Sequence, residues 1–91
     1  MSTEKQPRLG VAFLAYNEEE LIAKTVAEAV SSLSAIPGLD WRILVVDDGS
    51  RDRTGEIADG LAREDPRISV FHHDGNKGYA VATETALRNT P

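Results

Sequence analysis

A chain of 91 residues has room for one small domain with one hydrophobic core. Its composition, 41% hydrophobic and 27% charged residues, is typical of a globular protein and excludes a largely disordered one. Fifteen acidic residues against ten lysines and arginines give a formal charge of −5, which argues against a nucleic-acid partner, because phosphate-backbone binding needs a concentrated basic patch. The charge still allows a small anionic ligand, held by a helix N-terminus, a lysine or a bridging cation.

The absence of cysteine excludes disulfides, thiolate metal sites and thiol catalysis. The first eight residues are polar and charged, and no apolar run approaches the ~20 residues of a membrane span. We therefore expect a cytoplasmic chain without a membrane segment.

The first half of the chain predicts a strand, a helix and a second strand. Residues 9–15 form an apolar run whose continuous hydrophobicity is typical of a strand covered on both faces. Asn17 and the three glutamates after it predict a helix start with Asn17 as the cap, and residues 36–38 end that helix. The apolar stripe of this helix is expected at Leu21, Ile22, Thr25, Val26, Ala29, Val30 and Leu33. Residues 41–46 predict the second strand.

The second half continues the alternation. A helix is expected from near Asp52 to Asp65-Pro66, a strand over residues 67–72, and a third helix after residue 78. The order βαβαβα implies a parallel sheet with right-handed connections, which is a three-layer αβα, Rossmann-like α/β fold. No linker or internal repeat divides the chain, so we expect a single domain over residues 1–91.

Each predicted strand is followed by a polar or glycine-rich loop, at residues 16–18, 47–50 and 73–78. Parallel strands bring their carboxyl ends to one edge of the sheet, and open α/β folds bind ligands at that edge. The three loops are therefore the predicted ligand site.

Two adjacent acids, Asp47 and Asp48, come directly after the apolar run of the second strand. Turn formation and helix capping would explain both without a ligand. Their place at the predicted ligand edge favours a binding role, in which one carboxylate accepts from a ligand N–H while the other orients the loop or helps to hold a cation.

The loop after the first strand carries Tyr16, Asn17 and Glu18. Helix capping alone explains an Asn-Glu pair at a helix start. The Tyr16 ring could pack on a nucleotide base or against the core, and the sequence does not separate these alternatives.

The loop before the third helix is rich in glycine. Gly75 and Gly78 allow close backbone approach to a phosphate, and Lys77 lies next to the helix start. The adjacent His72 and His73 at the strand end point to opposite faces, so we interpret them as structural or solvated residues rather than a metal pair.

Taken together, "LAYNEEELIAKTV", "VVDDGSRDRTGEIA" and "NKGYAVATETAL" resemble, in order and spacing, the N-terminal half of the family 2 glycosyltransferases. That family has the GT-A nucleotide-sugar-binding fold and includes dolichol- and polyprenyl-phosphate sugar synthases. The middle motif is the most specific, and the resemblance extends from Arg8 to the end of the chain. Leu14 stands where the first family motif has a proline.

The resemblance implies a transferase that moves a sugar from a UDP- or GDP-sugar to an acceptor, with this chain supplying the nucleotide-binding half. Asp47 and Asp48 would flank the base and ribose, one of them accepting from a ring N–H, and Lys77 is a candidate for the diphosphate. The full set of implied nucleotide-binding residues is Ala15, Tyr16, Glu18, Asp47, Asp48, Asn76, Lys77 and Gly78.

The resemblance also implies a divalent cation, Mg²⁺ or Mn²⁺, and a carboxylate base in the complete enzyme. In the family an Asp-x-Asp motif on a fourth strand holds the cation, and the base follows later, both after the point that matches Pro91. We therefore expect an incomplete, inactive chain without catalytic residues or metal ligands. The fourth strand pairs beside the first, so the first strand is expected to be an unpaired edge that favours self-association. Membrane segments after residue 91 would put the longer protein at the inner membrane face.

Two alternatives remain open. One is a non-catalytic nucleotide-binding or interaction module. The other is a receiver-like phosphotransfer domain, in which paired acids hold Mg²⁺ for an aspartyl phosphate. The second is disfavoured because receiver-type acids would follow the first strand, where this chain has Ala-Tyr-Asn.

Overall fold

The computed structural model describes residues 8–89 and contains all six predicted elements in the predicted order. The side chain of Tyr79 and the residues before Arg8 and after Asn89, including the polar start of the chain, lie outside this description. Within residues 8–89 no helix has the length and apolar character needed to cross a membrane. The elements are β1 (Arg8–Ala15), α1 (Ile22–Ser34), β2 (Asp40–Asp47), α2 (Thr54–Glu64), β3 (Ile68–His72) and α3 (Tyr79–Asn89).

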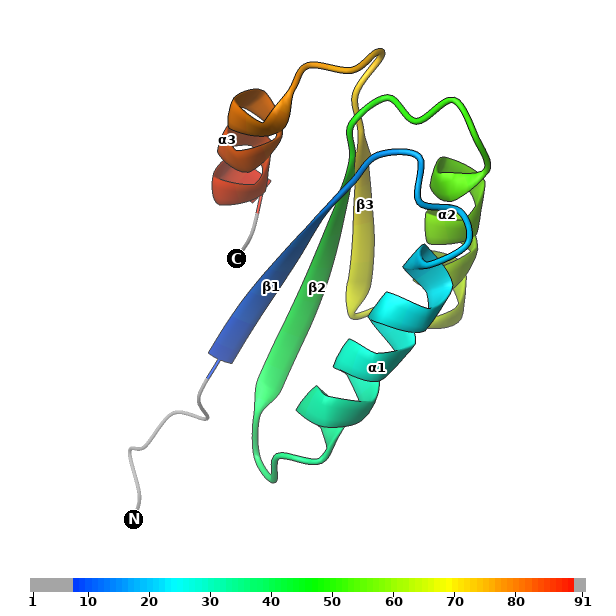
Figure 1. Ribbon diagram of the computed structural model, residues 1–91. Helices are drawn as coiled ribbons and strands as arrows, with labels where there is room; N and C mark the ends of the chain where they lie inside the picture. The colour runs from blue at the N-terminus through cyan, green and yellow to red at the C-terminus, as the bar shows by residue number, and fades with distance from the viewer. Residues whose placement is uncertain (1–7, 90–91) are drawn as a thin grey trace.

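The three strands form one parallel sheet in the order β1-β2-β3, with β2 in the centre. Helices α1 and α2 cover one face of this sheet and α3 lies on the other (Figure 1). The predicted three-layer αβα arrangement is therefore confirmed. The register places Ala15 beside Asp47, and Asp47 beside His72, so the carboxyl ends of all three strands meet at one edge.

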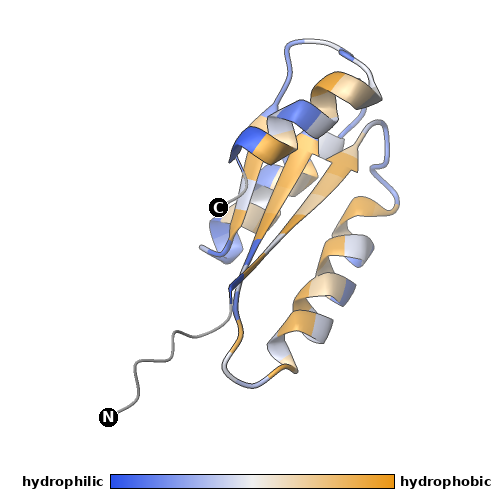
Figure 2. Cartoon of the chain, turned by 90° about the vertical axis from the view of Figure 1, so that its left-hand side faces the viewer, coloured by the Kyte–Doolittle hydropathy of each residue, from blue (hydrophilic) through white to orange (hydrophobic). Residues whose placement is uncertain are grey.

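Strand β2 is the centre of the core because helices cover it on both faces. Ile43 and Val45 pack in the cluster formed with α1 and α2, whereas Leu44 and Val46 pack with the buried alanines of α3. Full burial of an aliphatic side chain of this size stabilises a fold by about 1.5–3 kcal/mol. The unbroken apolar run of β2 thus reflects its two covered faces, and the hydropathy colouring of the strands shows it (Figure 2).

Helix α1 begins at Ile22, and the prediction that Asn17 caps it was wrong. Asn17 has a φ of 51°, in the left-handed region, and its side-chain Oδ1 accepts a hydrogen bond from the backbone N–H of Arg51 at 2.8 Å. The remote loop before α2 thus competes successfully for the group that was expected to cap the helix. Leu21, expected on the inner face, precedes the helix and is 58% exposed.

Strand β1 and helix α3 both leave apolar side chains exposed. Within the described residues β1 pairs only with β2, so it is an edge strand as predicted, and its Leu9 is exposed. On α3 the small residues Ala82 and Ala86 face the sheet, while Val81 and Leu87 are exposed. The apolar face of α3 is consequently narrow.

Candidate functional site at the carboxyl edge of the sheet

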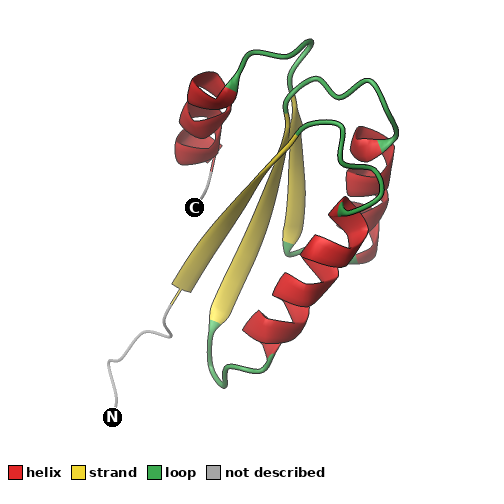
Figure 3. Ribbon diagram, viewed as in Figure 1, coloured by secondary structure: helices red, strands yellow, loops and turns green. Residues whose placement is uncertain are grey.

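The loops that follow β1, β2 and β3 lie together at one end of the molecule (Figure 3). A hollow of about 330 Å³ opens between the β1 end, the β2 end and the start of α3. It contains six of the eight predicted nucleotide-binding residues, and Asp47 and Lys77 do not line it. The lining residues are Leu14, Ala15, Tyr16, Glu18, Asp48, Asn76, Gly78 and Ala82.

Asp48 is the buried acid of this hollow, with only 6% of its surface exposed. Its backbone N–H extends the sheet pairing by donating to the Ala15 carbonyl at 2.9 Å. Its Oδ1 lies 2.7 Å from His73 Nδ1 and accepts from the backbone N–H of Lys77 at 2.9 Å. Its Oδ2 accepts from the backbone N–H of Gly78 at 3.0 Å. One carboxylate thus fixes the glycine-rich loop where the sequence predicts close backbone approach to a ligand.

These contacts keep Asp48 ionised. Burial by itself would raise the pKa of the Asp48 carboxyl, but the hydrogen bonds from His73, Lys77 and Gly78 outweigh it and lower this pKa below the ordinary 3.8. An ionised carboxylate only accepts hydrogen bonds and has about four acceptor positions. Within the described residues the protein fills both positions on Oδ1 and one on Oδ2, and one acceptor position on Oδ2 has no partner.

Asp47 faces the opposite side of the sheet, toward α2. Its Oδ1 accepts from the backbone N–H of Ser50 at 3.0 Å, and its Oδ2 lies 2.8 Å from His72 Nδ1. The second ring nitrogen of His72 lies 2.8 Å from Asp59 Oδ1 on α2. The structure therefore makes Asp47 part of a bridge between β2, β3 and α2.

The two histidines point to opposite faces of the sheet, as predicted, and each meets one of the two acids. His72 contacts Asp47 on the α2 side, whereas His73 contacts Asp48 on the α3 side. Their role as partners of the acids was missed. The signal that could have found it is the parallel register, since residues next to each other on neighbouring strands share a face.

The loop after β1 is tied to the loop before α2 by its backbone. Asn17 N–H donates to Ser50 Oγ at 3.0 Å, and Glu18 N–H donates to the fully buried Thr54 Oγ1 at 2.7 Å. The Asp52 carboxylate accepts from the backbone N–H of Thr54, the first residue of α2, at 2.9 Å, whereas the N-cap residue Arg53 makes no side-chain cap. These bonds hold Tyr16 and Glu18 at the rim of the hollow.

The paired acids do not form a metal site. Among residues 8–89 no group of three or more His, Asp or Glu side chains is arranged to hold a metal ion. Asp47 and Asp48 cannot converge on one ion, because their carboxylates face opposite sides of the sheet. This geometry also disfavours the receiver-like alternative, which requires converging acids.

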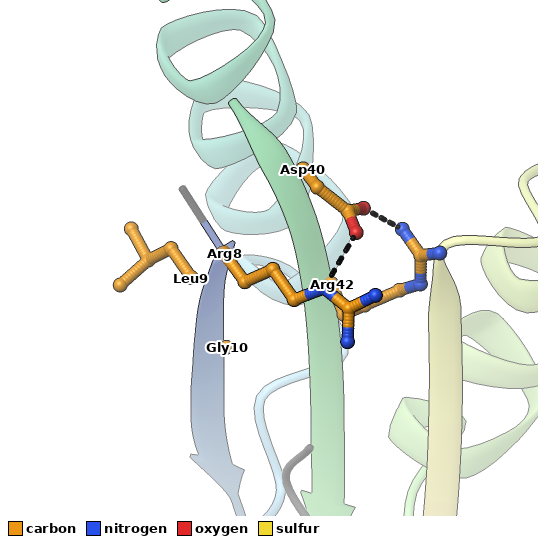
Figure 4. A pocket seen from close by; sticks show the side chains of 5 residues that line it. All are labelled: Arg8, Leu9, Gly10, Asp40 and Arg42. Carbon is orange, nitrogen blue, oxygen red and sulfur yellow. Dashed lines mark hydrogen bonds and ion pairs between the residues drawn. The ribbon is translucent and has the colours of Figure 1, made fainter. Parts of the chain in front are cut away.

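A second hollow, of about 230 Å³, lies at the opposite end of the sheet, near the starts of β1 and β2 (Figure 4). Asp40 lies there between two arginines, with its Oδ2 at 3.4 Å from Arg8 Nε and its Oδ1 at 2.6 Å from Arg42 Nη1. Exposed ion pairs of this kind contribute little stability. None of the predicted binding residues lies there, and the carboxyl edge remains the candidate site.

Comparison with known proteins places the chain in a family. The family model for glycosyl transferase family 2 matches residues 11–91. The glycosyltransferase AglD of Haloferax volcanii is 39% identical over 94 residues, which cover 93% of this chain and 15% of that protein. The undecaprenyl-phosphate mannosyltransferase of Micrococcus luteus is 41% identical over 73 residues, which cover 80% of this chain and 28% of that protein. The chain thus spans less than a third of the length of these relatives.

One solved structure extends the likeness to three dimensions. It is a mannosyltransferase from Pyrobaculum calidifontis in complex with GDP-Man and Mn²⁺. The two folds agree with a TM-score of 0.79 at 26% sequence identity, over 96% of this chain and 25% of that one. This agreement confirms the Rossmann-like fold expected for the start of a GT-A domain.

Proposed function

Because this chain belongs to glycosyl transferase family 2, we propose that the complete protein transfers a sugar from a UDP- or GDP-sugar to an acceptor, and that this chain supplies nucleotide binding. The observation that carries the proposal is the hollow at the carboxyl edge, where three loops bring six of the expected residues together. The complex of the Pyrobaculum calidifontis mannosyltransferase with GDP-Man supports the choice of a nucleotide sugar.

We propose that Asp48 recognises the base. Its free acceptor position on Oδ2 suits a ring N–H donor, such as those of uracil and guanine, and would leave an adenine ring nitrogen facing a carboxylate without a proton between them. Tyr16, at the rim and 39% exposed, is placed to stack on a base. Asn76 and Gly78 are assigned to the sugar and phosphate side of the nucleotide.

The two predicted residues that do not line the hollow receive different roles. Asp47 is proposed to support the site indirectly, since its carboxylate holds the loop after β2 through the Ser50 N–H. The exposed Lys77 follows Asn76 in the loop, and its side chain is proposed to reach the diphosphate once a nucleotide is bound.

We propose a divalent cation for the complete enzyme, as in the Mn²⁺ complex of the mannosyltransferase from Pyrobaculum calidifontis. Residues 8–89 do not fit such an ion, so its ligands and the catalytic base are assigned to other segments of the longer protein. A cation there would neutralise charge on the departing diphosphate. This chain's part is to bind and orient the nucleoside.

One further feature of the complete protein and one of the isolated chain are proposed. Its active site faces the cytoplasm at the membrane surface, because relatives are named for polyprenyl-phosphate substrates. The exposed β1 edge makes the isolated chain self-associate. Sedimentation across a concentration series tests the second feature, and a monomer at all concentrations would contradict it.

Calorimetric titration of the chain with UDP, GDP and ADP tests the proposed function. We expect UDP or GDP to bind and ADP to bind more weakly or not at all. Tyr16→Ala should weaken binding by about 1–3 kcal/mol, the usual contribution of an aromatic ring stacked on a base. Arg42→Gln, in the hollow at the far end of the sheet, is the matched control and should leave affinity unchanged. A folded chain that binds neither UDP nor GDP would overturn the proposal for these residues.

A further inference from the structure

A partly buried hydrogen-bonded chain runs from the candidate pocket to α3. Asp48 Oδ1 lies 2.7 Å from His73 Nδ1, and His73 Nε2 lies 2.8 Å from Thr85 Oγ1. The side chains of Asp48 and His73 are only 8% and 7% exposed. Water is therefore a poor substitute for any partner in this chain, and loss of one contact must be felt by the others.

The ionised Asp48 carboxylate fixes the direction of its hydrogen bond with His73. The Asp48 carboxylate is ionised and can only accept, so His73 Nδ1 must carry the proton and donate. In the neutral imidazole the other nitrogen, Nε2, is then an acceptor, and the Thr85 hydroxyl donates to it. A hydroxyl on α3 thus occupies the second nitrogen of a ring whose Nδ1 proton points at the pocket acid.

Other contacts hold the His73 ring in the same orientation. The backbone N–H of His73 donates to the Asp47 carbonyl at 2.9 Å, which continues the β2–β3 pairing past the end of β3. The Phe71 ring meets it edge-on, with centroids 5.8 Å apart and planes at 78°. The ring is therefore fixed by β2, β3 and α3 together.

We propose that His73 and Thr85 are positioning residues of the nucleotide pocket, which act by holding Asp48 so that one of its acceptor positions faces the ligand. The inference rests on the proposed function for the identity of that ligand. It gives α3 a part in binding through a residue, Thr85, that does not line the hollow. Asp48 in turn holds the backbone of Lys77 and Gly78, so the same chain sets the shape of the glycine-rich loop.

The first test needs no variant. Nitrogen-15 NMR of the histidine rings in the 91-residue chain reports which nitrogen carries the proton. We expect His73 to carry a proton on Nδ1. A predominant Nε2–H form would overturn the inference, because that ring could not donate to Asp48.

The second test removes the hydroxyl on α3. Thr85→Val keeps the shape of the side chain but cannot donate, whereas Thr85→Ser restores the donor. Thr83→Val is the matched control, because Thr83 Oγ1 is buried on the same helix without a hydrogen-bond partner among the described residues. Thr85→Val should reduce nucleotide affinity by about three- to tenfold, the range for one lost hydrogen bond. It should also shift the amide resonances of Lys77 and Gly78, and Thr85→Ser should reverse both effects.

The outcomes separate this inference from the proposed function. If the unmodified chain binds neither UDP nor GDP, the function fails, and the ring tautomer with the Lys77 and Gly78 amide shifts still decides whether Thr85 positions Asp48. If nucleotide binds equally well to Thr85→Val, Thr83→Val and the unmodified chain, the function stands and the positioning role is wrong.

Discussion

Gly49 and Gly75 lie on different loops, yet a β-carbon added to Gly49 would come within 2.2 Å of the Gly75 carbonyl carbon. Gly49 also has a φ of 71°, in the left-handed region that favours glycine. The contact packs the backbone of the loop after β2 directly against that of the loop after β3. Two of the three loops at the site therefore hold each other in place through their main chains.

Gly49→Ala should destabilise the fold by about 2–5 kcal/mol, because the left-handed conformation and the overpacked contact both oppose a side chain. Gly38→Ala is the matched control, since Gly38 has a φ of 76° but open space around its added β-carbon. Gly38→Ala should lower the free energy of unfolding by about 1–2 kcal/mol, because only the left-handed conformation opposes its side chain. Urea unfolding of both variants measures the difference. Equal decreases in the free energy of unfolding for the two variants would show that the Gly49–Gly75 contact does not constrain the loops.

Gly55 and Gly60 both lie in α2 and should respond to alanine with opposite signs. A β-carbon on Gly55 would lie 2.6 Å from Asp47 Oδ2 and 3.2 Å from the His72 ring, so Gly55→Ala must displace a buried, hydrogen-bonded acid. We expect a loss of about 1–3 kcal/mol. Gly60→Ala meets only Arg63 Nη2 at 3.7 Å and should gain about 0.5–1 kcal/mol from better helix propensity. Thermal unfolding should show melting points that move in opposite directions, and stabilisation by both variants would contradict this.

The stability of the fold should decrease as pH rises past the titration of His72. The hydrogen bond with Asp47, opposed by partial burial and reinforced by Asp59, raises the pKa of His72 above the ordinary 6.5. A raised folded-state pKa means that this contribution is complete below pH 6.5 and is lost as pH rises through the folded value. The contribution should stay below about 1 kcal/mol, because the ring is half-exposed and solvent screens the pairs.

Denaturant unfolding over about pH 5.5–8.5 measures this effect as the difference between the unmodified chain and His72→Gln. The difference should be largest at the acidic end of the range. Asp59→Asn should lower the pKa of His72 in an NMR titration, since it removes one of the two carboxylates beside the ring. If the difference in unfolding free energy between the unmodified chain and His72→Gln grows as pH rises, the predicted loss of stability with rising pH is wrong.

Thr54→Val should destabilise the fold and weaken nucleotide binding together. The buried Thr54 hydroxyl accepts from Glu18 N–H and donates to Asp52, so valine leaves a backbone donor of the site without its partner. We expect a loss of about 1–3 kcal/mol in the free energy of unfolding. Thr54→Ser keeps the hydroxyl and should lose only about 0.8 kcal/mol for the missing methyl. Chemical unfolding and titration with UDP and GDP compare the two variants. Equal affinity of both variants for nucleotide would show that the Thr54 hydroxyl does not contribute to binding.

The amino-acid sequence by itself determined the order of elements, the parallel sheet and the edge at which the three polar loops meet. A continuous apolar run such as residues 43–46 is typical of a strand that is covered on both faces, and parallel strands can be joined only by crossovers. The elements follow from local patterns of hydrophobicity, and their arrangement follows from the rule that parallel strands bring their carboxyl ends to one edge. Both could therefore be deduced before any contact was known. The same rule, together with the family motifs, led to eight predicted binding residues, and six of them line the hollow at that edge.

Only the tertiary structure decided which groups meet. Asn17 looked like a helix cap, but the remote Arg51 N–H competes for its side chain, and local propensity carries no information about that competition. Asp47 and Asp48 are neighbours in sequence, yet strand pleating turns them to opposite faces, where His72 and His73 meet them separately. Side-chain partners 25 residues apart depend on strand register, and register is fixed by packing of the whole sheet.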